Sequence, residues 1–254
     1  MRTLTNNLRS AGWCGAAAAP YPLGVVRAGE ALALAACGGG GGAAQLLPAA
    51  ALEPLISRAE AQAYSAPPGP AALRALLDEL ERGVRALTAG PRYRGAHAEA
   101  VATWAAPGQV YGAAVGHCRL YRVRGSSLLP LTRDETLYEE LLQHGQPALD
   151  WHRDVLTRAL GAGGARPWQI IAVPQEPGAA HLLCTGAVHG CLPPERLAAW
   201  TLEALAEPDL SVAVRHLWQR GHDWLAQEAR PARTSVHEYQ RRAALVLMRE
   251  PYGL

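Results

Sequence analysis

Residues 31–42 constrain the fold of this chain more than any other stretch. They read Ala-Leu-Ala-Leu-Ala-Ala-Cys followed by five consecutive glycines. A short apolar run that ends in glycine is typical of a buried strand followed by a tight turn. Because glycine has no Cβ, its backbone can adopt a positive φ and can approach a neighbouring group closely. The stretch therefore predicts a buried strand that ends at Cys37, with a candidate site at the turn.

The rest of the composition indicates a globular chain. Of its 254 residues, 49% are hydrophobic and 18% are charged, which separates it from disordered sequences. This length suits one domain of generous size, so we expect a single domain over residues 1–254.

Charge and cysteine usage exclude several classes of protein. The net charge is +2, with arginines scattered along the chain and no lysine, so we expect no nucleic-acid partner. Five cysteines without a Cys-x-x-Cys pair argue against a disulfide framework and a zinc ribbon. No apolar run approaches the ~20 residues that a membrane span needs, and the N-terminus lacks the apolar region of a signal peptide. We therefore expect a cytoplasmic protein with no membrane partner.

Hydrophobic periodicity predicts helices between two runs of strands. Leu73, Leu76, Leu77, Leu80, Val84 and Leu87 recur at helical spacing before Gly90, as in an amphipathic helix that packs on a core. Further helices are expected at residues 44–64, 135–144, 194–207 and 209–229. Strands are expected at residues 3–10, 99–105, 109–116, 118–124, 127–131, 168–173, 181–185 and 243–248. This order favours a central antiparallel β-sandwich of roughly ten strands, flanked by helices.

Several motifs in this order also resemble the signatures of a known family. Residues 37–42 stand where that family has Asp-Gly-Met-Gly-Gly-His, and residues 116–119 where it has Gly-Asp-Ser-Arg. Residues 131–134, Leu-Thr-Arg-Asp, are identical to a family segment, residues 182–187 replace Leu-Leu-Cys-Ser-Asp-Gly, and residues 241–242 replace Asp-Asn. On these motifs the chain resembles the metal-dependent protein phosphatases (PPM, or type 2C). The resemblance implies an α+β fold, a four-layer α-β-β-α sandwich.

The same resemblance implies a metal site that this chain has lost. A family member holds two or three Mg²⁺ or Mn²⁺ ions through aspartates, and a metal-bound hydroxide attacks a phosphoserine or phosphothreonine. The matching positions here are Cys37 with its neighbour Gly38, His117, Gly186, Gly190 and Arg241. None of these residues is a carboxylate, and a guanidinium repels cations. We therefore predict no catalytic residue, no metal and no cofactor, and we interpret the chain as a pseudophosphatase.

Each replaced position leaves an alternative open. Cys37 is expected to be a small buried hydrophobe. The alternative is a ligand to a soft metal such as zinc beside His117, with Cys118 or His189 nearby. Arg119 and Asp134, which match family residues around the hairpin, are assigned structural roles.

Arg241 also has two interpretations. We expect a protein carboxylate to pair with it, as a buried guanidinium requires. The alternative is an anion-binding pocket made by Arg241 and the backbone N–H groups of Gly39 and Gly40.

The hypothesis for function follows from these positions. We expect a catalytically inactive, bacterial phosphatase-like protein that binds, scaffolds or regulates a protein partner, such as a kinase, a phosphatase or a multiprotein assembly. The alternatives are a reader of phosphoryl or other anionic ligands, and a divergent Ser/Thr phosphatase with an altered metal site.

Overall fold

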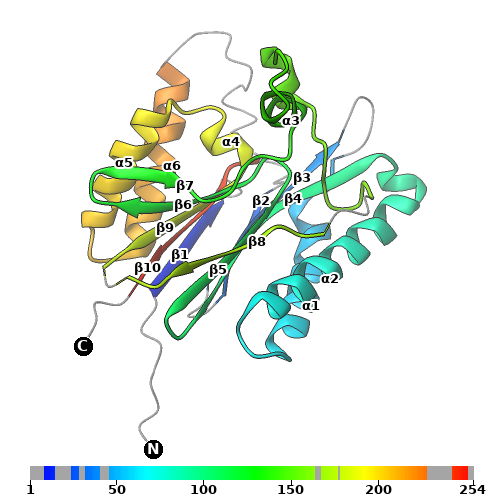
Figure 1. Cartoon of the computed structure of the whole chain (residues 1–254), viewed down its shortest axis with the longest axis horizontal. Coiled ribbons are helices and arrows are strands. Elements are labelled where there is room, and N and C mark those ends of the chain that lie inside the picture. Colours follow the sequence, from blue (N-terminus) through cyan, green and yellow to red (C-terminus); the bar gives the residue numbers. More distant parts are fainter. Residues whose placement is uncertain are drawn as a thin grey trace, which may run out of the picture.

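The computed structural model describes residues 9–14, 24–28, 32–40, 46–163, 167–176, 178–227 and 242–250. Within these ranges two antiparallel five-stranded sheets pack face to face, and helices cover the outer face of each sheet (Figure 1). The predicted antiparallel β-sandwich flanked by helices is thus confirmed.

The two sheets draw strands from both halves of the chain. The first sheet has the order β1 (Arg9–Cys14), β10 (Ala244–Arg249), β9 (Ala180–Cys184), β6 (Arg119–Arg124) and β7 (Ser127–Pro130). The second has the order β2 (Gly24–Ala28), β3 (Leu32–Gly40), β4 (Ala96–Ala106), β5 (Gln109–Val115) and β8 (Ile170–Pro174).

Helices form the two outer layers. The second sheet is covered by α1 (Ala49–Tyr64) and α2 (Pro70–Ala89), and the first by α5 (Pro194–Ala206) and α6 (Leu210–Gln227) (Figure 1). Short helices complete the connections: the 3₁₀ helices η2 (Pro91–Tyr93) and η3 (Asp150–Asp154), and the α-helices α3 (Leu137–Gln143) and α4 (Gly186–His189). No helix among the described residues is both long and apolar enough to span a membrane.

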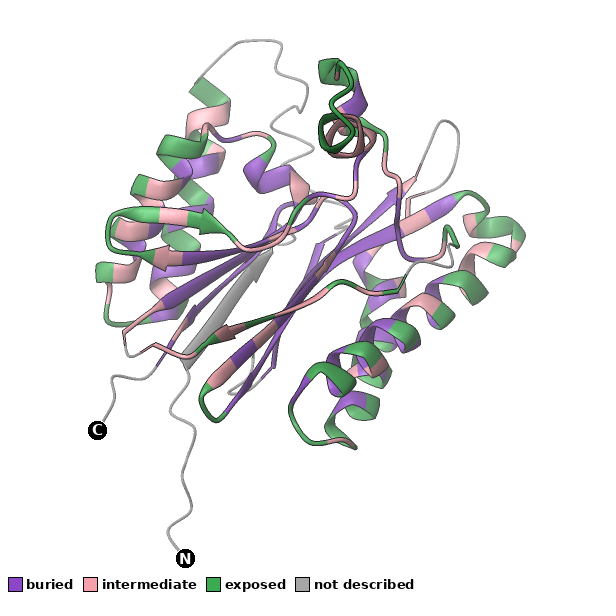
Figure 2. Cartoon of the chain, in the orientation of Figure 1, coloured by how far each residue is buried: buried purple, intermediate pink, exposed green. Residues whose placement is uncertain are grey.

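The alternation of large and small residues in β3 explains how the layers pack. Leu32 and Leu34 join the core cluster under α1 and α2, whereas Ala33 and Ala35 join the cluster between the two sheets. Successive residues of a strand point to opposite faces of its sheet, so the leucines meet the helices and the alanines meet the other sheet. In Figure 2 the strands are accordingly mostly buried, while the outer faces of the helices are exposed.

The structure corrects the prediction that the strand ends at Cys37. The strand β3 continues through Gly38 to Gly40, and these glycines pair with residues 96–98 of β4. A Cβ on Gly38 would lie 1.9 Å from the carbonyl oxygen of Leu47, so glycine is required there for close packing inside a strand. The predicted strand end was three residues too early, because glycine serves close packing within a strand as well as turns. Residues 41–45 lie outside the described part.

Other element boundaries differ in smaller ways. The strand expected at residues 3–10 is β1, which is described from Arg9 to Cys14, while residues 1–8 lie outside the described part. The helix expected from residue 44 begins at Ala49. Four short elements, β2, η2, η3 and α4, were not predicted from the sequence.

Candidate functional site

A cleft of about 480 Å³ lies at the end of the sandwich where β3 and β9 end and where β4 and β6 begin. It is lined by Glu99, His117, Arg119, Arg153, Asp154, Gly186, Ala187, His189, Gly190, Cys191, Leu192, Pro193, Pro194 and Arg242. Three positions at which the sequence predicts lost aspartates, His117, Gly186 and Gly190, therefore meet in one cleft.

Glu99 joins the three segments that meet here. It is buried in β4, directly opposite Cys37 of β3. Its Oε2 accepts a hydrogen bond from the backbone N–H of His117 at 2.7 Å, and its Oε1 accepts one from Arg242 at 2.7 Å. Both carboxylate oxygens of Glu99 are thus engaged by donors of the protein.

A glycine before β6 and the hydrogen bonds of Thr185 position the two donors that bind Glu99. Gly116 has a φ of 77°, and a Cβ there would lie 2.8 Å from Cγ of Glu99, so glycine lets the turn before β6 approach the carboxylate. On the other side, the Thr185 hydroxyl donates to the carbonyl of Arg242 at 2.9 Å and accepts from the backbone N–H of Ala244 at 3.0 Å. These bonds fix the start of β10, and with it Arg242, at the end of β9.

A second buried carboxylate, Asp134, lies behind His117. Arg119 donates two hydrogen bonds to it, from Nε to Oδ1 at 2.6 Å and from Nη2 to Oδ2 at 2.8 Å. The Nε2 of His117 lies 3.0 Å from Oδ2 of Asp134. Burial alone would raise the pKa of Asp134, but the hydrogen bonds from His117 and Arg119 outweigh it and hold the pKa below its usual range. Asp134 is therefore an ionised partner in a network that ties β6 to the segment after β7.

The imidazole of His117 fills the space beside two glycines. A Cβ on Gly186 would lie 2.6 Å from Nδ1 of His117 and 2.6 Å from its carbonyl oxygen. A Cβ on Gly190 would lie 3.3 Å from Cε1 of the same ring. The histidine and the glycines thus fit one another, and an aspartate at residue 186 would overlap the segment around His117.

His189 of α4 completes a group of potential metal ligands. Its ring packs edge-on against His117, with the ring centroids 4.6 Å apart, and its Nε2 lies 3.1 Å from the carbonyl oxygen of His117. Burial lowers the pKa of His189 to about 3, so the ring is neutral near pH 7. Ligand atoms of His117, Asp134 and His189 lie within 4.8 Å of one another. Arg119, however, already binds both oxygens of Asp134 and places a fixed positive charge beside the group.

The cysteine proposed as a soft-metal ligand lies elsewhere. Cys37 is buried and is not one of the described residues that line the cleft. Nor is it part of the histidine and aspartate group just described. Burial raises the pKa values of Cys118 and Cys184 well above the usual thiol range, so without a bound metal both side chains are protonated thiols.

Of the residues proposed for an anion pocket, the structure describes the glycines but not Arg241. Arg241 lies outside the described residues, whereas the next residue, Arg242, forms the ion pair with Glu99. Gly39 and Gly40 belong to β3 and do not line the cleft. A Cβ on Gly39 would lie 2.3 Å from Nε2 of His97, so that glycine accommodates an imidazole.

Glu99 and Arg242 were not among the predicted site residues. The signal for Glu99 was the one carboxylate in a mostly apolar strand, Ala-His-Ala-Glu-Ala-Val-Ala-Thr-Trp-Ala-Ala. A buried carboxylate needs a partner, and in the structure that partner is Arg242.

The donors at the cleft do not fit the metal centre that the family resemblance implies. Mg²⁺ requires oxygen ligands in near-octahedral geometry. Among the described residues lining the cleft, the carboxylates are Glu99 and Asp154. Glu99 is bound by Arg242 and by a backbone N–H, and Asp154 is exposed. This set cannot supply the several shared carboxylate oxygens of a dinuclear centre.

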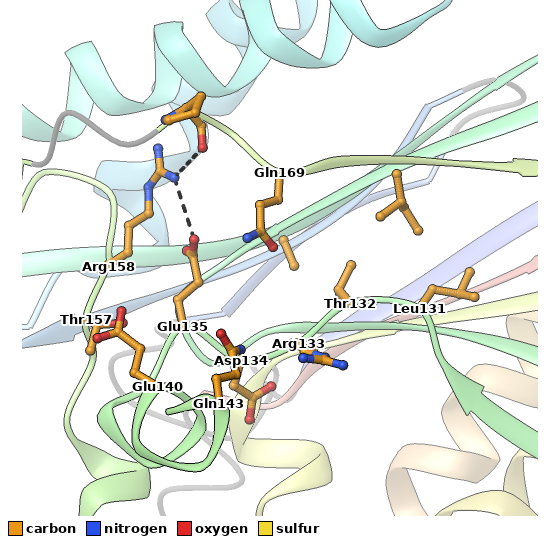
Figure 3. Close-up of a pocket in the computed structure, with 13 residues that line it drawn as sticks. Leu131, Thr132, Arg133, Asp134, Glu135, Glu140, Gln143, Thr157, Arg158 and Gln169 are labelled. Atoms are coloured by element: carbon orange, nitrogen blue, oxygen red, sulfur yellow. Dashed lines mark hydrogen bonds and ion pairs between the residues drawn. The ribbon is translucent and has the colours of Figure 1, made fainter. Parts of the chain in front are cut away.

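A second cavity of about 540 Å³ lies beside α3 (Figure 3). In it the buried Arg158 pairs with Glu135 at 3.6 Å and donates to the carbonyl of Pro167 at 2.9 Å. The guanidinium also lies over the ring of Trp168, 3.8 Å from its centroid. These contacts make Arg158 a bridge between the segment after η3 and the segment before β8.

Comparison with known proteins gives matches at the level of structure. No family model matches the sequence, and no curated protein matches it either. The serine/threonine phosphatase PstP of Mycobacterium tuberculosis is similar with a TM-score of 0.73 and 20% identity, covering 97% of this chain and 99% of that one. PppA of Pseudomonas aeruginosa has a TM-score of 0.71 and 21% identity, covering 96% and 97%.

A third similar structure is the PPM Ser-Thr phosphatase MsPP of Mycobacterium smegmatis, with a TM-score of 0.69 and 22% identity over 96% of this chain and 97% of that one. The likeness extends over nearly the whole of each chain and includes both sheets and both helical layers. The chain therefore has the fold of the PPM-type Ser/Thr protein phosphatases.

Proposed function

We propose that this chain is a catalytically inactive protein of the phosphatase fold that regulates or scaffolds a protein partner. One observation carries the proposal: the buried carboxylate at the centre of the cleft, Glu99, is paired with the guanidinium of Arg242 at 2.7 Å. A fixed positive charge thus occupies the cleft and is neutralised within the protein.

Physical chemistry supports this interpretation. A dication placed near Arg242 would be repelled by it, and the repulsion is strong where water is largely excluded. To bind the cation, Glu99 would have to give up its ion pair with Arg242, which would separate the half-buried guanidinium from this carboxylate. The chain instead retains a well-packed sandwich around the cleft, which supports a role that depends on its surface.

The name of one similar protein supports a regulatory role. One similar protein, PppA, is described as a key regulatory component of T6SS. By analogy, the partner of this chain would be a kinase, a phosphatase or a multiprotein assembly.

The experiment that tests inactivity is hydrolysis of p-nitrophenyl phosphate and of a phosphothreonine peptide with added Mn²⁺ or Mg²⁺. We expect turnover no higher than that of a His117→Ala variant purified in the same way, because any activity shared by the two is contamination. Turnover that rises with Mn²⁺, disappears with chelator and is lost in His117→Ala would show that the chain is an enzyme.

A second candidate function is an enzyme with an altered metal site, favoured by the group of His117, Asp134 and His189. Two histidines and one carboxylate suit a transition metal such as zinc better than Mg²⁺. Metal analysis of the purified protein by plasma mass spectrometry separates the two functions. About one equivalent of zinc, iron or manganese that is lost in His189→Gln would favour this candidate, and a metal-free protein would favour the first.

A further inference from the structure

The segment from α3 to η3 carries an unusual share of exposed apolar side chains. Leu142, Leu149, Trp151 and Val155 are 50%, 57%, 55% and 37% exposed. Among the described residues, the other large apolar side chains with comparable exposure are Tyr64 and Leu129, which lie apart from this segment and from each other in sequence. We call these four side chains, with the acidic residues of 137–155, the α3–η3 surface.

These apolar side chains contribute little to the core. No residue of α3 is buried, and of η3 only His152 is. The segment is held at its base by two backbone hydrogen bonds. The N–H of Leu137 donates to the carbonyl of Val155 at 2.8 Å, and the N–H of Thr157 donates to the backbone carbonyl of Glu135 at 2.8 Å. Figure 2 shows α3 standing away from the two sheets, with exposed and half-buried residues around it. Packing among the described residues therefore does not explain why this surface is apolar.

The charge of the same segment is opposite to that of the chain. Residues 137–155 contain four acidic side chains, Glu139, Glu140, Asp150 and Asp154, and one arginine, Arg153. The guanidinium of Arg153 stacks on Tyr138, 3.4 Å from the ring centroid. The whole chain carries +2, so the acidic character is a local property of this surface.

The α3–η3 surface also lies between the two hollows of the molecule. Arg153 and Asp154 line the cleft, while Glu140 and Gln143 line the second cavity. A ligand bound to this surface would have a concave region on either side to receive its side chains.

We propose that the α3–η3 surface docks a segment of a protein partner that carries apolar side chains flanked by arginine or lysine. Exposed Trp151 and the leucines offer the aromatic and aliphatic anchors on which binding energy concentrates. The surrounding carboxylates select a basic partner and speed its association. This proposal rests on the proposed function, because it gives the chemistry of the partner that a regulatory module would bind.

The test uses the full chain and fluorescently labelled synthetic peptides of about 18 residues, five helical turns. One peptide carries a leucine and tryptophan face with arginine and lysine elsewhere, and a matched peptide carries glutamate in place of the basic residues. Fluorescence anisotropy should show binding of the basic peptide only. Trp151→Ser should weaken that binding at least about tenfold, and Tyr64→Ser, an equally exposed aromatic elsewhere, should leave it unchanged. Raising the salt concentration from about 0.05 to about 0.5 M should weaken binding of the basic peptide to the wild type.

Several results would overturn the proposal. These are no binding of the basic peptide, equal binding of the acidic peptide, or equal effects of Trp151→Ser and Tyr64→Ser. A dimer in sedimentation that Trp151→Ser dissociates would show that the occupant is a second copy of this chain. The phosphatase assay on the same preparations separates this proposal from the proposed function. Metal-dependent turnover would reject only the inactivity, and absent peptide binding in an inactive protein would reject only the docking surface.

Discussion

Glu99 is the buried carboxylate of the cleft, and the side chain of its partner Arg242 is one quarter exposed. We expect Arg242→Ala to lower the free energy of unfolding, since it leaves a buried carboxylate without its guanidinium. Breaking a buried ion pair costs about 3–5 kcal/mol, and the exposure of Arg242 places the expected loss at the low end. Urea denaturation of the variant measures it.

The double variant Glu99→Gln with Arg242→Ala provides the control. Replacing the carboxylate by a neutral amide removes the uncompensated charge, so much of the lost stability should return. A double variant no more stable than Arg242→Ala alone would mean that the ion pair is not the source of the loss.

Gly186 gives a second prediction at the residue scale. In Gly186→Ala the added methyl would meet both the ring and the carbonyl oxygen of His117 at 2.6 Å, and such overpacking costs about 1–3 kcal/mol. His117→Ala should recover only part of this loss in the double variant, because the carbonyl remains. Gly90 is the matched control, because its φ is −76° and an added Cβ would lie 3.4 Å from the nearest atom, the carbonyl oxygen of Leu87. Equal melting temperatures for Gly186→Ala and Gly90→Ala would refute the steric argument.

His189 predicts how stability depends on pH. It faces the His117 ring, Tyr121, Arg119 and Asp134, and burial lowers its folded-state pKa to about 3 from an ordinary value near 6.5. The unfolded chain therefore binds this proton first as pH falls. Stability is full above about pH 6.5 and is lost toward pH 3, by up to about 1.4 kcal/mol per pH unit. Asp134 adds to the loss only at the acidic end of this window, below about pH 4. Urea denaturation between pH 7 and about pH 4, above the range in which Asp134 contributes, should show a steeper loss of stability in the wild type than in His189→Gln. Parallel curves would contradict the lowered pKa of His189.

At the scale of elements, two helices carry leucines with opposite roles. Leu77 of α2 is fully buried, whereas Leu142 of α3 is half exposed. We expect Leu77→Ala to destabilise the fold by about 2–5 kcal/mol, and Leu142→Ala to change stability by no more than about 0.5 kcal/mol. Chemical denaturation of both variants compares them. A large loss in Leu142→Ala would mean that α3 belongs to the core, and it would remove the basis for a docking surface there.

The elements also show what the sequence could predict. The leucines of α2 repeat at helical spacing because that face packs on a sheet, so pattern alone located the helix. The cleft was located through His117, Gly186 and Gly190, which stand in motifs resembling a known family. Glu99 and Arg242 were not found, because their pairing joins residues 143 positions apart and no local pattern encodes such a contact. The same holds for Gly38, whose role depends on the carbonyl of Leu47.

At the scale of the whole molecule, the proposed function predicts no linkage between folding and divalent cations. A ligand stabilises a protein only if it binds the native state better than the unfolded state. We therefore expect millimolar Mg²⁺ or Mn²⁺ to leave the melting temperature unchanged relative to chelator, as measured by differential scanning fluorimetry. A rise with Mn²⁺ that His117→Ala abolishes would point to a metal bound in the cleft.

The interlocking of His117 with Gly186 also has a consequence for evolution. A chain that is to gain a carboxylate at residue 186 must both give up the imidazole at residue 117 and move the backbone there, because the ring and the carbonyl oxygen of His117 both occupy the space that a side chain at residue 186 would need. The order of mutations is therefore constrained, and a direct path passes through a less stable intermediate. Selection for folding alone would tend to hold both positions as they are, even in a lineage where hydrolysis would be useful.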